Sequence, residues 1–331
     1  MRFGRSIFAL IILMFFLPSL AGCACEQKQA PMSETRILLD TFCTITVYGA
    51  RDRRLLDEAF DLCAEYEALL SKSAEGSDVW RINDAGGDPV TVAAGTIDVI
   101  RAGLEFGELS AGMFDITIGR LTTLWDFSGD PRVPTKTGLA DVLETVDYSK
   151  VMIHGDTVRL TDPDAWLDLG GIAKGYIAEC LAGFLKDSGV AGAVVDLGGD
   201  VAVVGGKPDG SAWMIGVRQP FGGHSELLGV IETGEASIVT SGIYERQFEE
   251  NGILYHHILD PKDGMPAVSD VVGATVVAQS AVVGDALSTI ALLVGSELAE
   301  ALLIGFPGFI GALLVLDNGD LLQLGSIDFH T

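Results

Sequence analysis

The sequence predicts an α+β fold built as a single compact domain. Strand-like segments follow one another in runs, above all between residues 191 and 261, and helical segments lie between these runs. The regular alternation of strand and helix that a doubly wound parallel sheet requires does not occur. The chain has 331 residues, of which 48% are hydrophobic, and no low-complexity linker follows residue 35. One domain with a large core, spanning residues 36–331, therefore accounts for most of the chain.

The N-terminal half is predicted to contain strands, turns and amphipathic helices. β-Branched and aromatic residues from Ile37 to Gly49 indicate a strand. Residues 53–71 carry apolar side chains at helical spacing and acidic ones on the other face, which predicts a helix. The remaining predictions here are a turn-rich segment over 71–92, a helix over 96–112, strand and loop structure with clustered aromatics over 112–134, a short helix over 139–146 and a hairpin over 151–171.

The C-terminal half is predicted to be richer in strands. Residues 175–189 form an amphipathic pattern that ends at Gly189, a residue typical of a helix C-terminus. Glycine-rich connections separate strand-like segments at 191–206, 213–220, 227–242 and 256–261. Residues 284–306 are apolar enough for one long buried helix, and residues 311–325 indicate a closing hairpin.

Charge and the N-terminal segment restrict the class of protein. The net charge is −25, from 46 acidic and 21 basic residues, which argues against nucleic acid as a partner. The apolar run from Ile7 to Leu17 follows two arginines and is shorter than the roughly 20 residues of a membrane span. It leads into Leu20-Ala21-Gly22-Cys23, which resembles a bacterial lipobox.

The lipobox divides the N-terminal segment into two predicted parts. Residues 1–22 are predicted to be a lipoprotein signal peptide, and residues 23–35 a polar tether whose Cys23 thiol carries lipid. This arrangement places the protein on the extracytoplasmic (periplasmic) face of a bacterial cell membrane, held by its lipid anchor. An ordinary signal peptide with a coincidental cysteine is the alternative.

Residues 167–179, LDLGGIAKGYIAE, combine charged residues and glycines at a predicted strand-to-helix turn. Asp168 precedes Gly170 and Gly171, and Lys174 follows in the first turn of the helix. Glycines allow a backbone to approach a ligand closely, and a helix start presents free N–H groups to an anion. The standard nucleotide fingerprints GxxxxGK[ST] and GxGxxG are absent. A ligand-binding loop and a plain tight turn both remain open.

Four further segments carry candidate functional side chains. Residues 196–200, DLGGD, repeat the Asp-Gly-Gly pattern, and Asp115 lies in a loop after a predicted helix. His256 and His257 are adjacent in a predicted strand, so they point to opposite faces and only one is expected to face a site. Asp285 and Thr289 share one helix face and offer the hard oxygen ligands that Mg²⁺ prefers.

Six motifs occur together in one order along the chain: FDITIG, DLGGIAKGY, DLGGD, TSGIYER, HHILDPKDGMP and GDALSTIALLVG. This order resembles the ApbE family of FAD:protein FMN transferases, which are flavin-trafficking lipoproteins. The resemblance implies a T-fold-like α+β architecture of mixed sheets with packed helices, forming one catalytic domain. It also implies FAD as substrate, Mg²⁺ as cofactor and a reaction that moves FMN from FAD onto a threonine hydroxyl of an acceptor protein, releasing AMP.

The resemblance also implies roles for individual residues. His257 would be the catalytic imidazole, in preference to His256. The residues implied to contact FAD are Leu39, Ser73, Met113, Phe114, Asp115, Asp168, Lys174 and, through its backbone, Leu259. The residues implied to bind Mg²⁺ are Gly171 through its carbonyl, Asp285 and Thr289, with Ser288 as a further ligand.

Three positions depart from the pattern of the family. Leu39-Asp40 stands where many relatives have Met-Gly, Ser73 where some have an aromatic residue, and Ser288 where a second aspartate is common. The departure at Ser73 keeps open an FAD pyrophosphatase that gives FMN and AMP, and a non-catalytic FAD-binding lipoprotein is the other alternative. The implied partners are exported acceptor proteins with FMN-binding domains, such as membrane redox subunits. A monomer and a homodimer both remain open.

Overall fold

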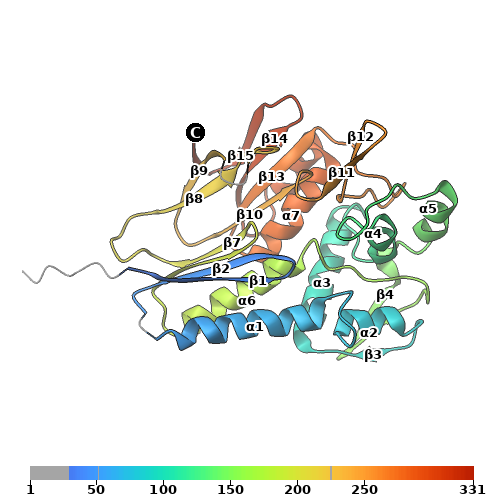
Figure 1. The fold of residues 1–331 in the computed structure, drawn as a ribbon, viewed down its shortest axis with the longest axis horizontal. Coiled ribbons are helices and arrows are strands. Elements are labelled where there is room, and N and C mark those ends of the chain that lie inside the picture. The colour runs from blue at the N-terminus through green and yellow to red at the C-terminus, as the bar shows by residue number, and fades with distance from the viewer. Residues whose placement is uncertain (1–29, 51, 224–225) are drawn as a thin grey trace, which may run out of the picture.

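The computed structural model describes residues 30–50, 52–223 and 226–331, and its main feature is one large antiparallel sheet (Figure 1). The predicted signal peptide and Cys23 lie outside the described residues. Within the described part of the chain, none of the helices is both long and apolar enough to cross a membrane.

The large sheet has eight strands in the order β1-β2-β6-β7-β10-β13-β14-β15. Every strand pairing among the described residues is antiparallel, apart from an isolated parallel bridge between Ile118 and Trp166. The strands are β1 (Met32–Leu38), β2 (Thr41–Tyr48), β6 (Gly192–Leu197), β7 (Asp200–Gly205), β10 (Ser237–Gly242), β13 (Val271–Ala278), β14 (Phe309–Leu316) and β15 (Leu321–Gly325).

Helices cover one face of this sheet and a smaller sheet covers the other. The helices α1 (Arg54–Leu70), α6 (Ala173–Asp187) and α7 (Ala281–Val294) pack on the first face (Figure 1). Strand β7 shows the alternation, since Ala202 and Val204 belong to the core under the helices while Val201 and Val203 face the smaller sheet. That smaller sheet contains β8 (Trp213–Arg218), β9 (Leu227–Thr233) and β16 (Asp328–His330).

Most of the remaining elements gather at one end of the large sheet, on the right of Figure 1, and α8 (Ser296–Leu303) packs on α7 and β14. Besides α8, the remaining elements are α2 (Asp78–Asp84), α3 (Ala94–Leu109), α4 (Gly119–Trp125), α5 (Lys136–Leu143), a 3₁₀ turn at Tyr148–Lys150, a small sheet of β3 (Val90–Thr91), β4 (Val151–His154) and β5 (Thr157–Leu160), and a hairpin of β11 (Gln247–Glu250) and β12 (Ile253–His256). Mixed antiparallel sheets with packed helices confirm the predicted α+β class.

The first predicted strand is wrong in detail, because residues 37–49 belong to two strands. The chain reverses at Leu39 and Asp40, whose φ angles are +54° and +57°, so Leu38 pairs with Thr41 across a two-residue turn. Neither residue is a glycine or asparagine, the usual signal for such a turn. Strand β1 also begins at Met32, so residues 32–35 are paired in the sheet and are not part of the tether. Its outward side chains are polar, for example Ser33 and Thr35, which gives the segment the composition of a tether.

Three other predictions are corrected by local structure. Residues 71–92 contain α2, which begins where the Ser77 hydroxyl accepts a 2.9 Å hydrogen bond from the Trp80 N–H. Residues 112–134 contain α4 rather than a strand. The last residue of that helix, Trp125, is fully buried and so anchors the helix in the core. The predicted long helix over 284–306 is two helices, α7 and α8, because the chain breaks at Gly295, where φ is +80°.

Candidate active site

The start of α6 lies against α7, and a glycine makes this contact close. A Cβ atom on Gly175 would lie 2.4 Å from the carbonyl oxygen of Ala281 and 2.7 Å from the Cβ of Asp285. The Gly175 N–H donates a 2.8 Å hydrogen bond to Oδ2 of Asp285. The glycine therefore brings the motif at residues 167–179 and the predicted metal-binding helix into contact.

Two buried carboxylates and one lysine form the centre of the site. Lys174 Nζ lies 2.7 Å from Oδ2 of Asp200, which is fully buried, and Oδ1 of Asp200 has no hydrogen-bond partner among the described residues. Burial and the neighbouring Asp200 charge raise the pKa of Asp285. Burial lowers the pKa of Lys174, but the negative charges of Asp200 and Asp285 have a larger combined effect and raise that pKa. The lysine side chain is therefore positively charged.

The donor set at this centre suits a divalent cation. Two adjacent carboxylates are opposed by one ammonium group, so a cation would relieve the excess negative charge. A Cβ on Gly171 would lie 3.0 Å from the Phe114 ring and 3.7 Å from Cγ2 of Thr289, so the Gly171 backbone and Thr289 are neighbours. The predicted ligands are thus brought together at the α6–α7 contact, and their oxygen atoms are of the hard type that Mg²⁺ prefers.

Ser288 is held by neighbouring protein groups. Its hydroxyl donates to the Asp285 carbonyl at 2.9 Å and shares a 2.7 Å hydrogen bond with the Ser241 hydroxyl on β10. Ser288 is fully buried between α7 and the sheet, whereas Thr289 is half-buried. These contacts fix α7 on β10, and a role of Ser288 in metal binding stays a prediction.

Asp168 is fixed by two residues that the sequence analysis did not identify. Its Oδ2 accepts hydrogen bonds from Lys72 Nζ at 2.7 Å and from the Thr122 hydroxyl at 2.6 Å, and its Oδ1 accepts one from the Gly170 N–H at 2.9 Å. Burial raises the pKa of Asp168, but the Lys72 charge and these hydrogen bonds outweigh it and lower that pKa. Lys72 is the single basic residue in the segment between α1 and α2, and this isolated positive charge in the sequence could have marked it as a candidate site residue. Its neighbour Ser73 is exposed.

The prediction that both histidines lie in one strand is wrong for His257, because β12 ends at His256 and residue 257 lies in a bend. His256 ends β12 and is buried, whereas His257 is half-buried and lies near enough to Lys174 for that charge to lower its pKa. Burial is the larger cause and, with the neighbouring charges, lowers the pKa of His257 to about 4, so its imidazole is neutral at pH 7. Its Nδ1 lies 3.2 Å from the carbonyl oxygen of Arg246. A hydrogen on Nδ1 would make that contact a hydrogen bond and leave Nε2 free to accept a proton.

Three of the residues predicted to contact FAD, Met113, Phe114 and Asp115, lie in the segment beside the metal-site candidates. Phe114 is buried and touches Gly171, and Met113 is half-buried. The Asp115 carboxylate is used within the protein, because Oδ1 accepts from the N–H and the hydroxyl of Thr117 at 2.7 and 2.6 Å while Oδ2 accepts from the Tyr148 N–H at 2.8 Å. Asp115 therefore joins two loops, and its contact with FAD stays a prediction.

Leu39 and Leu259 have clear structural surroundings. The Leu39 N–H donates to Oε1 of Glu67 at 2.8 Å, which holds the β1–β2 turn on α1. Leu259 is buried in a small apolar cluster with Leu121 and Trp125, which anchors the segment that carries His257. A separate hollow between the end of β2 and the start of α1, lined in part by Tyr48 and Arg54, contains none of the predicted site residues.

Known proteins resemble this chain in sequence over most of its length. The sequence profile of the ApbE family matches residues 39–313. The chain is 31% identical over 338 residues to an FAD:protein FMN transferase of Treponema pallidum, with 96% of this chain and 93% of the relative covered. It is 33% identical over 270 residues to one of Klebsiella pneumoniae, with 80% and 83% covered.

Solved structures give the same result. The crystal structure of the ApbE protein of Thermotoga maritima matches with a TM-score of 0.81 at 32% identity, covering 89% of this chain and 97% of that one. The flavin transferase ApbE from Vibrio cholerae matches with a TM-score of 0.77 at 26% identity, again covering 89% and 97%. The resemblance carried by the six motifs is thereby confirmed, and the chain belongs to the ApbE family.

Proposed function

We propose that this protein is an FAD:protein FMN transferase that uses Mg²⁺ to move FMN from FAD onto a threonine hydroxyl of an exported acceptor, releasing AMP. Membership of the ApbE family supports the flavin transfer. The observation that carries the rest is the cluster of the buried Asp200 and Asp285 with the half-buried Lys174 near the α6–α7 contact, with His257 close to Lys174.

Each residue of the site would contribute a distinct effect. The Gly171 carbonyl, Asp285 and Thr289 would hold Mg²⁺, which when bound supplies charge neutralisation for the pyrophosphate. The Lys174 ammonium would lie beside the same negative charge. Asp168, kept ionised by Lys72, would orient polar groups of the flavin nucleotide.

His257 would act as the general base for the acceptor. A neutral imidazole at pH 7 can take the proton of the threonine hydroxyl as its oxygen bonds to the phosphorus of the FMN unit. The bond between that phosphorus and the bridging oxygen breaks, and AMP leaves with the oxygen. Positioning and charge compensation supply most of the catalysis in phosphoryl transfer, so the pre-formed cluster matters more than the base alone.

The lipidated Cys23 would hold the enzyme on the extracytoplasmic face of the cell membrane. Its acceptors would be exported proteins with FMN-binding domains, such as membrane redox subunits. A domain that begins at Met32 leaves only a short tether after Cys23, so the site would stay close to membrane-bound acceptors.

The test mixes the soluble form, residues 24–331, with FAD, Mg²⁺ and an exported FMN-binding domain, and weighs the acceptor by intact-mass spectrometry. A mass gain of one FMN is expected with the native chain and with His154→Ala, a variant at an exposed histidine outside the site. The gain is expected to be lost in His257→Ala and Asp285→Ala. AMP and free FMN without a labelled acceptor would instead identify an FAD pyrophosphatase. Intact FAD throughout would identify a binding protein.

A further inference from the structure

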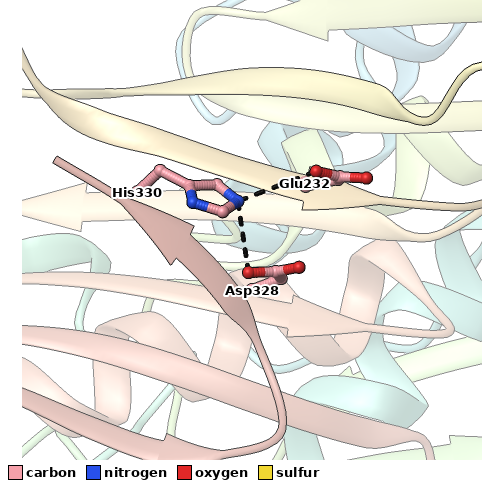
Figure 2. A group of neighbouring side chains, drawn as sticks. All are labelled: Glu232, Asp328 and His330. Atoms are coloured by element: carbon pink, nitrogen blue, oxygen red, sulfur yellow. Dashed lines mark ion pairs between the residues drawn. The ribbon is translucent and has the colours of Figure 1, made fainter.

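A second group of metal-ligating side chains lies at the C-terminal strand, away from the residues of the active site. Glu232 on β9 and Asp328 and His330 on β16 project from the same face of the small sheet (Figure 2). Asp328 pairs directly with Glu232 in the strand register, and His330 is two residues further along β16. The period of a strand therefore places all three side chains together.

Strand β16 is paired with β9, so the backbone positions of the two strands bring the three side chains close together. Phe329, between the two ligating residues, points to the other face and packs against the core under the small sheet. Gly229 on β9 makes the close approach possible, since a Cβ there would lie 2.4 Å from the His330 carbonyl oxygen and 2.5 Å from the Phe329 ring. The strand that carries Asp328 and His330 is thereby held against the strand that carries Glu232.

One of the distances between the three side chains already lies in the range found around a single metal ion, and the longer ones can shorten by rotation of the exposed side chains. His330 Nε2 lies 3.2 Å from Oδ1 of Asp328 and 3.7 Å from Oε2 of Glu232, and one ligand atom from each residue lies within 4.8 Å of the others. Metal–ligand bonds of about 2.0–2.2 Å separate neighbouring ligands of one ion by about 3.0–3.6 Å. We propose that these residues bind a divalent transition-metal ion, with Zn²⁺ as the first candidate.

The ligand types distinguish this site from the active site. Imidazole suits Zn²⁺, Ni²⁺ and Cu²⁺, whereas Mg²⁺ takes oxygen ligands. All three side chains are exposed, so water can complete the coordination. The bound ion would fasten β16, a three-residue edge strand, to β9. Without a metal, the same residues would form only an ion pair between a protonated His330 and the carboxylates.

The test is a calorimetric titration of the tag-free, chelator-treated chain with Zn²⁺ in the presence of excess Mg²⁺, which occupies oxygen-ligand sites. One equivalent is expected to bind to the native chain and to His154→Ala, which removes a different exposed histidine. His330→Ala and Asp328→Asn are expected to bind at least about tenfold more weakly, because even outer partners of metal ligands are worth that much. Equal Zn²⁺ binding by the native chain and His330→Ala, or no binding by either, would overturn the proposal.

A second measurement covers the possibility that Asp328→Asn or His330→Ala loosens β16 by itself. Hydrogen exchange of the β16 and β9 amides is followed with and without Zn²⁺. Slower exchange on adding Zn²⁺ is expected in the native chain and in His154→Ala, and no change in His330→Ala. The same slowing in all three chains would contradict binding at this cluster.

Discussion

Replacing Gly175 by alanine is expected to force α6 and α7 apart. The added Cβ would lie 2.4 Å from the Ala281 carbonyl oxygen, whereas ordinary contact begins at 3.4 Å, so the helices must separate by about 1 Å. Neither contact is the end of a flexible side chain, because one is backbone and the other is the Cβ of Asp285. The substitution therefore strains the structure at the proposed metal site.

The size of the effect follows from two opposing terms. Overpacking of a well-packed contact costs about 1–3 kcal/mol of unfolding free energy. Alanine regains up to about 1 kcal/mol through its higher helix propensity. Because neither contacted group can swing aside, the overpacking cost should lie in the upper part of its range, at about 2–3 kcal/mol, and a net loss of about 1–2 kcal/mol is expected. Proposed Mg²⁺ binding should weaken as well, because the hydrogen bond from the Gly175 N–H to Asp285 lengthens.

Gly183→Ala on the same helix is the matched control. A Cβ at Gly183 meets no described atom within 4 Å, so only the helix-propensity term acts there and a gain of up to about 1 kcal/mol is expected. Both variants are compared with the native chain by urea unfolding and by the Mg²⁺ concentration that gives half-maximal FMN transfer. A Gly175→Ala chain as stable as the native one, or an equal loss in Gly183→Ala, would refute the packing argument.

Three further predictions concern the charged groups of the site. Asp200→Ala leaves the charged Lys174 without its nearest partner; because Lys174 is partly exposed and Asp285 remains beside it, the expected cost in urea unfolding is about 2 kcal/mol, and a change below about 0.5 kcal/mol would contradict a stabilising ion pair. Lys72→Met removes the charge that helps to lower the pKa of Asp168, so the variant is expected to be less stable than the native chain at pH 7. That difference should shrink as the pH falls through the lowered Asp168 pKa, below its ordinary value of 3.8, and a difference that grows in acid would have the wrong sign. With the pKa of His257 near 4, the transfer rate against pH is expected to show no step near 6.5 and to fall only toward pH 4, and a step near 6.5 that vanishes in His257→Ala would contradict the neutral imidazole.

The sequence by itself determined the order of the motifs and the elements with strong local patterns. Helices α1, α3 and α6 lie where apolar spacing predicts them, because an amphipathic helix carries its own signal in consecutive residues. The helical spacing of Asp285 and Thr289 likewise predicts that they share a face, since i and i+4 are neighbours on any helix.

Only the tertiary structure decided how residues distant in the chain meet. Lys72 and Asp168 are 96 residues apart, and Lys174 and Asp200 are 26 apart, so no local pattern could pair them. The turn at Leu39 and Asp40 lacks the glycine that marks such turns, so the sequence does not reveal it. The pairing of β1 with β2 and the contact with Glu67 hold its backbone in the left-handed conformation. Local propensity is set by neighbours along the chain, whereas these charges and this turn are fixed by packing between elements.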